Sequence, residues 1–178
     1  MNVSEQGARR DRHFVIPRTL LFVTRKNPQT AANEVLLLKG APTKRLWANL
    51  YNGLGGHVEA GEDIVAAAQR ELAEEAGLHQ VALQMRGLVH IHTGQDSAGA
   101  MRPGVLLFVF AGELVQGDAP LSSTAEGTPE WLPIADLAAL PLVDDLYTLL
   151  PLVLAGGDLL YANYMPDETG RLHYHFHR

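Results

Sequence analysis

The sequence contains no cysteine among its 178 residues. A disulfide framework, thiolate catalysis and a zinc–thiolate site are therefore excluded, and a reducing intracellular compartment is permitted. The opening stretch, MNVSEQGARRDR, lacks the apolar run of a signal peptide, and no stretch reaches the ~18 apolar residues of a membrane span. These absences predict a cytoplasmic protein with no membrane partner.

Basic charge is also scarce, because 14 lysines and arginines stand against 20 acidic residues, a formal net charge of −6. Nucleic-acid binding depends on basic contacts to phosphates, so a nucleic-acid polymer is excluded as the main partner. A small anionic substrate would need a cation to bridge it to so acidic a protein.

The chain is long enough for one domain with a sizeable core, since 47% of its residues are hydrophobic. We find no internal repeat, low-complexity segment or linker. The prediction is a flexible tail over residues 1–13 and a single domain over residues 14–178, present as a monomer or a homodimer.

Hydrophobic patterning indicates a mixed α/β domain, a sheet with helices packed on its faces. Its strands are predicted over 14–25, 34–39, 81–93, 105–114 and 129–134, with a terminal hairpin over 158–178. Helices are predicted from Asp63 to Gly77, over 135–140 and over 143–156, the last interrupted or bent at Pro151. The loop 94–104 is interpreted as a hairpin connection, with closure over a ligand as the alternative.

Acidic side chains crowd one face of the first predicted helix. Glu71, Glu74 and Glu75 fall within an arc of about 100°. An adjacent core-facing stripe is predicted at Val65, Ala68, Leu72 and Ala76. Only Arg70 balances the clustered acids, and grouped oxygen ligands with a deficit of positive charge suit Mg²⁺ or Mn²⁺. The alternative is a solvated acidic face.

The spacing around this helix is specific. In GHVEAGEDIVAAAQRELAEEAGL, Gly56 is followed after five residues by Glu62 and after seven more by Arg70-Glu71-Leu72, then Glu74-Glu75 and Gly77-Leu78. This pattern resembles the Nudix box without a departure. The resemblance implies a Nudix α/β/α sandwich that hydrolyses a nucleoside diphosphate linked to a further group.

The resemblance also implies roles for the residues of the box. Glu71, Glu74 and Glu75 become candidate metal ligands or the catalytic base, and Arg70 would orient them. Gly56 would offer its carbonyl to the metal, and Glu62 would support the loop.

A further glutamate in the region of Glu126 often joins the metal site of Nudix enzymes, so Glu126 is a candidate ligand and catalytic residue. The alternative is an ordinary exposed loop acid. Mg²⁺, with Mn²⁺ as substitute, would neutralise the pyrophosphate and activate the attacking water, whose proton a carboxylate can accept.

Residues outside the box resemble those of MutT-type hydrolases of oxidised purine nucleotides. Asn52 stands where an Asn contacts the base, and an amide offers both a donor and an acceptor. Asp144 and Asp145 match an Asp pair that faces the purine, although they could equally form a helix N-cap with a first-turn acid. An aromatic residue expected before this pair is replaced by Leu142 and Val143. Stacking would then come from Trp47, Tyr51 or Trp131.

Other side chains are candidate contacts to the substrate. Candidate phosphate-binding residues are Lys39, Lys44, Arg45 and Arg102. His90 and His92 alternate along one strand, as do His173, His175 and His177, so each set can share a face. Because no partner ligand occurs at zinc-like spacing, we interpret them as strand residues that could line the pocket.

Together these features predict a Mg²⁺-dependent pyrophosphohydrolase that converts a nucleoside triphosphate, such as the oxidised purine 8-oxo-dGTP, to the monophosphate and pyrophosphate. Its role would be nucleotide sanitation. One alternative is hydrolysis of ADP-ribose or another nucleoside diphosphate derivative. A second, from another class, is a non-catalytic regulatory module that binds a nucleotide.

Overall fold

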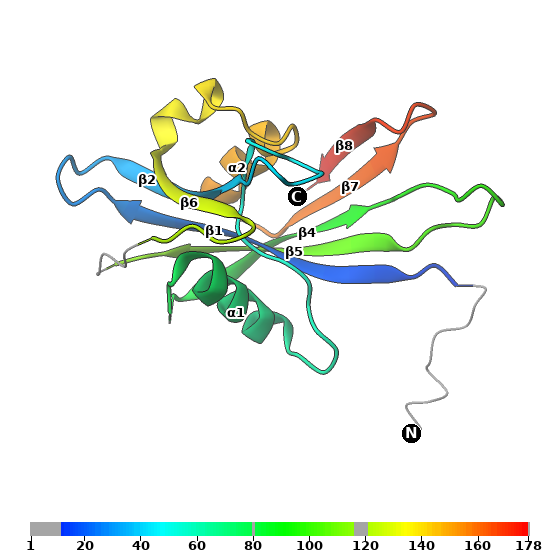
Figure 1. Ribbon diagram of the computed structural model, residues 1–178, viewed down its shortest axis with the longest axis horizontal. Coiled ribbons are helices and arrows are strands. Elements are labelled where there is room, and N and C mark those ends of the chain that lie inside the picture. Colours follow the sequence, from blue (N-terminus) through cyan, green and yellow to red (C-terminus); the bar gives the residue numbers. More distant parts are fainter. Residues whose placement is uncertain (1–11, 80, 116–120, 178) are drawn as a thin grey trace.

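The computed structural model describes residues 12–79, 81–115 and 121–177 (Figure 1). All but the last two residues of the predicted tail, 1–13, lie outside the described residues. The strands are β1 (Val15–Lys26), β2 (Asn33–Gly40), β3 (Tyr51–Asn52), β4 (Leu83–Ile91), β5 (Gly104–Glu113), β6 (Gly127–Pro133), β7 (Leu160–Pro166) and β8 (Leu172–His177). The helices are α1 (Ile64–Ala76), the 3₁₀ helix η2 (Ile134–Ala139) and α2 (Leu146–Leu154).

The strands form one mixed sheet in the order β3-β2-β1-β5-β4-β7-β8, with β6 paired to β2. The β1–β5 and β4–β7 pairs are parallel, and the other pairs are antiparallel. Figure 1 shows α1 on one side of the sheet and α2 on the other. The predicted mixed sheet with helices on its faces is therefore confirmed.

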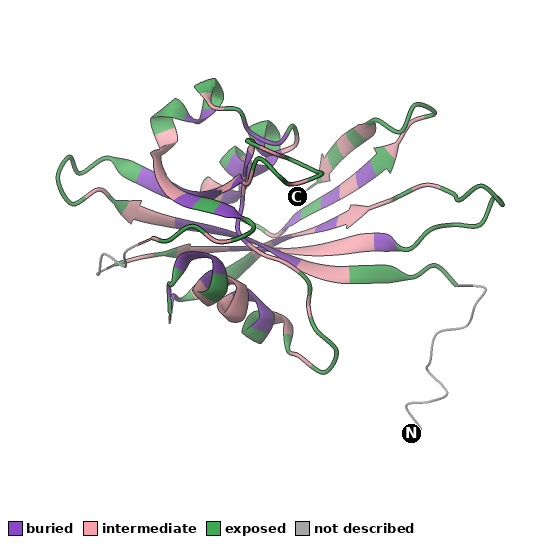
Figure 2. Cartoon of the chain, in the orientation of Figure 1, coloured by how far each residue is buried: buried purple, intermediate pink, exposed green. Residues whose placement is uncertain are grey.

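Two hydrophobic clusters fill the two faces of the sheet (Figure 2). Neighbouring residues of β1 divide between them, because successive side chains of a strand point to opposite faces. Leu21 packs with Leu72 of α1, whereas Phe22 packs with Leu149 of α2. The long apolar run of β1 thus predicts a central strand buried on both sides.

Helix α1 begins and ends as its sequence predicts. Oδ1 of Asp63 accepts hydrogen bonds from the N–H groups of the first turn at 2.9 and 3.1 Å. Gly77 ends the helix with φ of 66°, a left-handed conformation that favours glycine. The prediction that Val65 faces the core was wrong: it is 48% exposed, because the buried part of the helix starts only at Ala67.

Two further differences from the predicted elements concern local signals, whereas the predicted hairpin connection is present. The two-residue strand β3 is too short to produce a periodic pattern. Helix α2 runs through Pro151 without interruption. The loop 94–103 joins two antiparallel neighbours, β4 and β5, as a hairpin connection.

Within the described residues, no helix is long and apolar enough to cross a membrane.

Candidate active site

The glycine-rich loop after β3 is joined to α1 through Glu75. The Gly55 N–H donates a 2.7 Å hydrogen bond to Oε2 of Glu75, whose residue is only 5% exposed. The pKa of Glu75 is raised to about 7, mainly by burial and also by the charges of Glu71 and Glu126, whereas the Gly55 hydrogen bond opposes this rise. The Glu75 carboxyl group is thus buried, with other acids near it and few cations.

Arg70 connects the other acids of the box to one another. Its Nε lies 2.9 Å from Oε1 of Glu62, and its Nη1 lies 2.9 Å from Glu71 Oε1 and 3.0 Å from Glu74 Oε2. Nη2 also donates to the carbonyl oxygen of His57 at 3.0 Å. These hydrogen bonds, first of all those with Glu62, raise the pKa of Arg70. The planar guanidinium therefore fixes several acidic side chains relative to the loop.

Gly56 lies directly against this acidic cluster. A Cβ atom at this position would collide with the Glu71 carboxylate, so only glycine allows the loop and helix to come so close. The Gly56 carbonyl accepts a 2.8 Å hydrogen bond from the Thr19 N–H and retains a second lone pair.

The acids that influence one another come from two segments far apart in the sequence. Glu71 and Glu75 belong to α1, and Glu126 directly precedes β6. Glu126 is paired with Lys44 at 3.0 Å and lines the same small cavity as Glu75. Several hard oxygen donors thus gather here, and Arg70 and Lys44 balance only part of their charge. This donor set fits Mg²⁺ or Mn²⁺.

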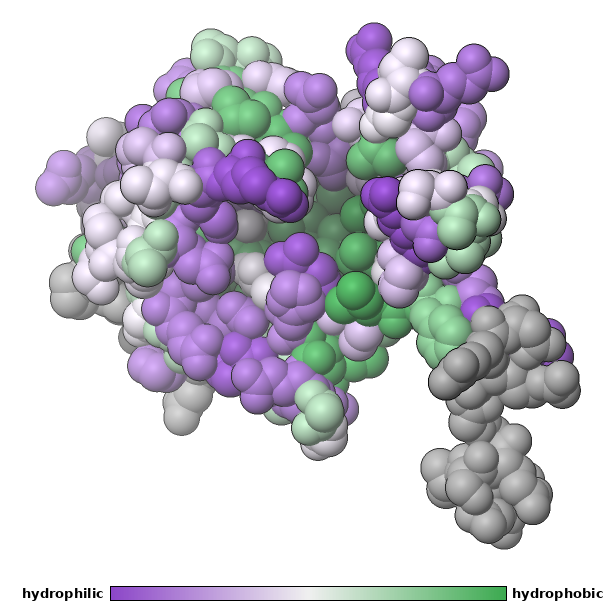
Figure 3. Space-filling view, turned by 45° about the vertical axis from the view of Figure 1, so that its right-hand side comes forward, coloured by the Kyte–Doolittle hydropathy of each residue, from purple (hydrophilic) through white to green (hydrophobic). Residues whose placement is uncertain are grey.

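A larger apolar cavity of about 480 Å³ lies beside the small one, a size typical of a small-molecule site. Asn52, Asp144 and Asp145 are among its lining residues. Six residues line both cavities, namely Arg18, Trp47, Leu50, Asn52, Gly53 and Gly55. Figure 3 shows a hollow with a hydrophobic floor and a hydrophilic rim. The acids and the Asp pair therefore belong to one continuous cleft.

Asp145 precedes α2 and faces this cleft. The Tyr164 hydroxyl donates a 3.0 Å hydrogen bond to Oδ2 of Asp145. Burial raises the pKa of Asp145, and the neighbouring Asp144 charge adds to the rise. Asp145 occupies the N-cap position, but its side chain makes no capping hydrogen bond and the first turn holds no acid, so the helix-cap alternative is met only in part. Its carboxyl group is therefore available to the cavity.

Of the three aromatic residues considered for stacking, Trp47 lines both cavities and is 42% exposed. Tyr51 is buried and donates a 2.8 Å hydrogen bond to Glu130. Trp131 lies under the Arg25 guanidinium, whose Cζ is 4.3 Å from the ring centre. Only Trp47 of these three lines the cleft.

The cations of the cleft differ partly from those expected. Lys44 lines the small cavity, and Arg18 lines both, although sequence reasoning missed Arg18. Its signal was a charged residue inside β1, two positions before the apolar run 20–23. Lys39 places its Nζ 5.4 Å from the Tyr51 ring centre, and Arg102 lies in the exposed β4–β5 connection. Neither Lys39 nor Arg102 lines these two cavities, and their phosphate contacts stay predictions.

Known structures share this architecture. A MutT protein from Bacillus halodurans superposes with a TM-score of 0.72 at 23% identity, over 91% of this chain and 97% of that chain. The NUDIX domain of Shewanella oneidensis NrtR, solved with ADP ribose, gives a TM-score of 0.67 at 16% identity, over 87% and 98% of the two chains. These likenesses establish the fold.

Curated relatives match shorter stretches. The mouse oxidized purine nucleoside triphosphate hydrolase is 32% identical over 107 residues, which are 57% of this chain and 64% of the mouse protein. An m7GpppN-mRNA hydrolase of Xenopus laevis is 39% identical over 62 residues, 34% of this chain and 21% of the frog protein. The chain thus spans less than two thirds of either relative.

The family model described as NUDIX domain matches residues 17–153, well over half of the chain and the whole of the cleft's acidic end. Together with the fold and the complete box on α1, this match shows that the chain belongs to the NUDIX family.

Proposed function

We propose that this chain is a divalent-cation-dependent pyrophosphohydrolase that cleaves a nucleoside triphosphate to a nucleoside monophosphate and pyrophosphate. The observation that carries the proposal is the continuous cleft. One end gathers the oxygen donors of Glu71, Glu75 and Glu126, and the other is an apolar cavity with polar groups at Asn52 and Asp145. A nucleotide has the matching halves, a charged phosphate chain and a flat base.

The acidic end would hold the cation through Glu71, Glu74, Glu75 and Glu126, with the Gly56 carbonyl as a further ligand. When bound, Mg²⁺ supplies charge neutralisation on the phosphates and activation of the attacking water. Arg70 holds the Glu71 and Glu74 carboxylates in place through its guanidinium.

Glu75 has the properties of a proton acceptor in this arrangement. Its pKa of about 7 in the cation-free protein places it between the charged and neutral forms at neutral pH. Its backbone partner, Gly55, lines both cavities, so the carboxylate is held beside the path of the phosphate chain. Arg18 lines both cavities as well and can contact the same phosphates.

The apolar end supports a purine as the base. Asn52 Oδ1 accepts the Gly53 N–H at 2.8 Å, which leaves its amide NH₂ as a donor. Asp145, with its raised pKa, can donate as well as accept beside Asp144. Trp47 offers a ring at the edge of the cavity. The similarity to the mouse oxidized purine nucleoside triphosphate hydrolase supports oxidised purine triphosphates as the substrate class.

The test is product analysis on a panel of normal and oxidised nucleoside triphosphates, ADP-ribose and nucleotide sugars, with and without Mg²⁺. We expect Mg²⁺-dependent release of pyrophosphate, with kcat/KM highest for an oxidised purine. Phosphate release, or release without a divalent cation, would contradict the cleavage chemistry.

Two other outcomes would redirect the proposal. Preference for ADP-ribose would retain the proposed role of the acidic end in cleavage and overturn the role of the Asp pair in base recognition. The aliphatic Leu142 and Val143 in place of an aromatic ring are consistent with this outcome. Nucleotide binding without any turnover would overturn catalysis and leave a regulatory module.

A further inference from the structure

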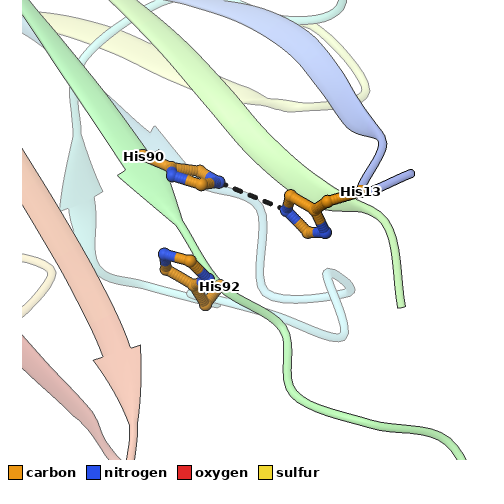
Figure 4. A group of neighbouring side chains, drawn as sticks. All are labelled: His13, His90 and His92. Atoms are coloured by element: carbon orange, nitrogen blue, oxygen red, sulfur yellow. Dashed lines mark hydrogen bonds between the residues drawn. The ribbon is translucent and has the colours of Figure 1, made fainter. Parts of the chain in front are cut away.

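Three histidines that line neither cavity of the cleft form a cluster (Figure 4). His90 lies in β4, His92 directly follows it, and His13 precedes β1. One ring nitrogen of each lies within 4.8 Å of the others. The ring centres of His90 and His92 are 4.1 Å apart, and that of His13 is 5.4 Å from His90 and 5.9 Å from His92. The sequence predicts that His90 and His92 share a face of one strand, but it gives no sign that His13 lies beside them.

This trio lies on the opposite face of the sheet from the apolar cavity, the face that packs against α1. Ile91 and Thr93 line the apolar cavity, and His90 and His92 alternate with them along the chain. The His92 N–H donates to the Tyr164 carbonyl at 2.9 Å, so the extended ladder continues past the end of β4. The expectation that these two histidines line the pocket is therefore wrong, and none of the trio lines either cavity of the proposed hydrolytic site.

The separation of the imidazole nitrogens matches metal coordination. Nε2 of His13 lies 3.3 Å from Nε2 of His90. Two nitrogens bound to zinc at about 2.0–2.1 Å in a tetrahedron are about 3.3–3.4 Å apart. A hydrogen bond between two rings is the alternative, but 3.3 Å is long compared with the usual value of about 2.9–3.0 Å.

A second contact orients the third ring. Nε2 of His92 lies 2.9 Å from Oδ1 of Asn163, and an amide oxygen can only accept, so this nitrogen carries the proton. The lone pair of His92 is then on Nδ1. A hydrogen bond from the second ring nitrogen to a carbonyl or carboxylate oxygen is the usual support of a metal-binding histidine.

Glycine leaves room between the rings. A Cβ on Gly104 would lie 3.0 Å from Nε2 of His13 and 3.3 Å from Nε2 of His90. The site thus has three nitrogen donors and open space between them.

We propose that His13, His90 and His92 bind one divalent transition-metal ion, Zn²⁺ or a close chemical equivalent. Imidazole donors favour such ions, whereas Mg²⁺ prefers oxygen, so the two sites select different metals. Three protein ligands leave the fourth tetrahedral position to water or an external group. The ion would tie the segment before β1 to β4 across Gly104 of β5.

The test is calorimetric titration of the full chain with Zn²⁺ in excess Mg²⁺, which occupies the carboxylate cluster. We expect one tight site per chain, and at least about tenfold weaker binding in His13→Gln and in His90→Gln. His79→Gln is the matched control, because His79 is exposed and outside the trio. Circular dichroism checks that each variant is folded.

Two further measurements separate metal binding from a simple contact between rings. Co²⁺ should give the intense visible absorption of a tetrahedral site in the wild type and lose it in His90→Gln. Asn163→Ala, which removes only the support of His92, should weaken Zn²⁺ binding by about tenfold or more. Equal Zn²⁺ affinity in the wild type and the His13 and His90 variants, or no binding in any, would overturn the proposal whatever the hydrolase assays show.

Discussion

The Gly55 backbone N–H donates a 2.7 Å hydrogen bond to Oε2 of Glu75, twenty residues later in the chain. This contact holds the glycine-rich loop against α1 and positions a buried carboxylate beside the cleft. Gly56 lets the loop come close to Glu71 in the same way. The arrangement of loop and helix, rather than the helix alone, builds the acidic site.

Replacing Glu75 with Gln tests the central carboxylate. The change removes the charge and the proton acceptor but leaves an oxygen that can still accept the Gly55 N–H. We expect kcat to fall by about 100-fold or more with the fold retained, measured as pyrophosphate release at saturating Mg²⁺. Glu59→Gln, an exposed acid of the same loop, is the control and should keep near-normal activity. A Glu75→Gln variant with unchanged kcat would remove Glu75 from the mechanism.

The raised pKa of Glu75 predicts how the cation-free protein responds to pH. The folded state holds this proton up to pH of about 7, against an ordinary value of 4.5 in the unfolded chain. As pH rises through this window the unfolded state is favoured, by about 3 kcal/mol once Glu75 is fully charged. In EDTA, Glu75→Gln should therefore be more stable than the wild type at pH 8 but not at pH 4, measured by urea unfolding. The same difference at both pH values would contradict this.

Arg70→Lys tests the guanidinium as a positioning group. Lysine keeps the charge but cannot contact Glu62, Glu71 and Glu74 at once. We expect a loss of kcat of about tenfold or more, the value of at least one lost charged hydrogen bond, and a higher Mg²⁺ concentration for half-maximal rate. Arg86→Lys, on β4 and outside both cavities, is the control. If the Mg²⁺ dependence of Arg70→Lys is unchanged, the guanidinium does not organise the acids.

Asp145→Asn tests recognition of the base. Asparagine keeps one oxygen that can accept from Tyr164, but it lacks the charge and the second oxygen of the carboxyl group that lines the apolar cavity. We expect kcat/KM for the preferred purine triphosphate to fall about tenfold, the value of one specific hydrogen bond, with the Mg²⁺ dependence unchanged. Asp158→Asn, an exposed acid beyond α2, serves as the control. An equal loss for every substrate in the panel would argue against a role in base selection.

Gly77→Ala isolates the end of α1. The glycine has φ of 66°, and a Cβ there would meet no atom within 4 Å. The cost is therefore backbone strain alone, about 1 kcal/mol of unfolding free energy, without a steric clash. Chemical denaturation measures it, and a variant as stable as the wild type would show that the left-handed turn relaxes freely.

Much of the fold and the box could be predicted from the sequence because those signals are local. The alternation that buries Leu21 and Phe22 on opposite faces is a property of β1 alone, and Asp63 and Gly77 mark the ends of α1 within its own turns. The fixed spacing of the box places Arg70 within reach of Glu74 on any α-helix. Predictions failed where the extent of packing mattered, as at Val65, or where an element was as short as β3.

Only tertiary structure decided which distant groups meet. Arg18 reaches the cleft because β1 passes beneath the glycine-rich loop, and His13 meets His90 because β1, β5 and β4 are adjacent in the sheet. Such contacts depend on strand order and register, which arise from packing of the whole chain and leave no fixed spacing in the sequence. The residue types at the site were readable in the chain, whereas their partners, burial and shifted pKa values came from the fold.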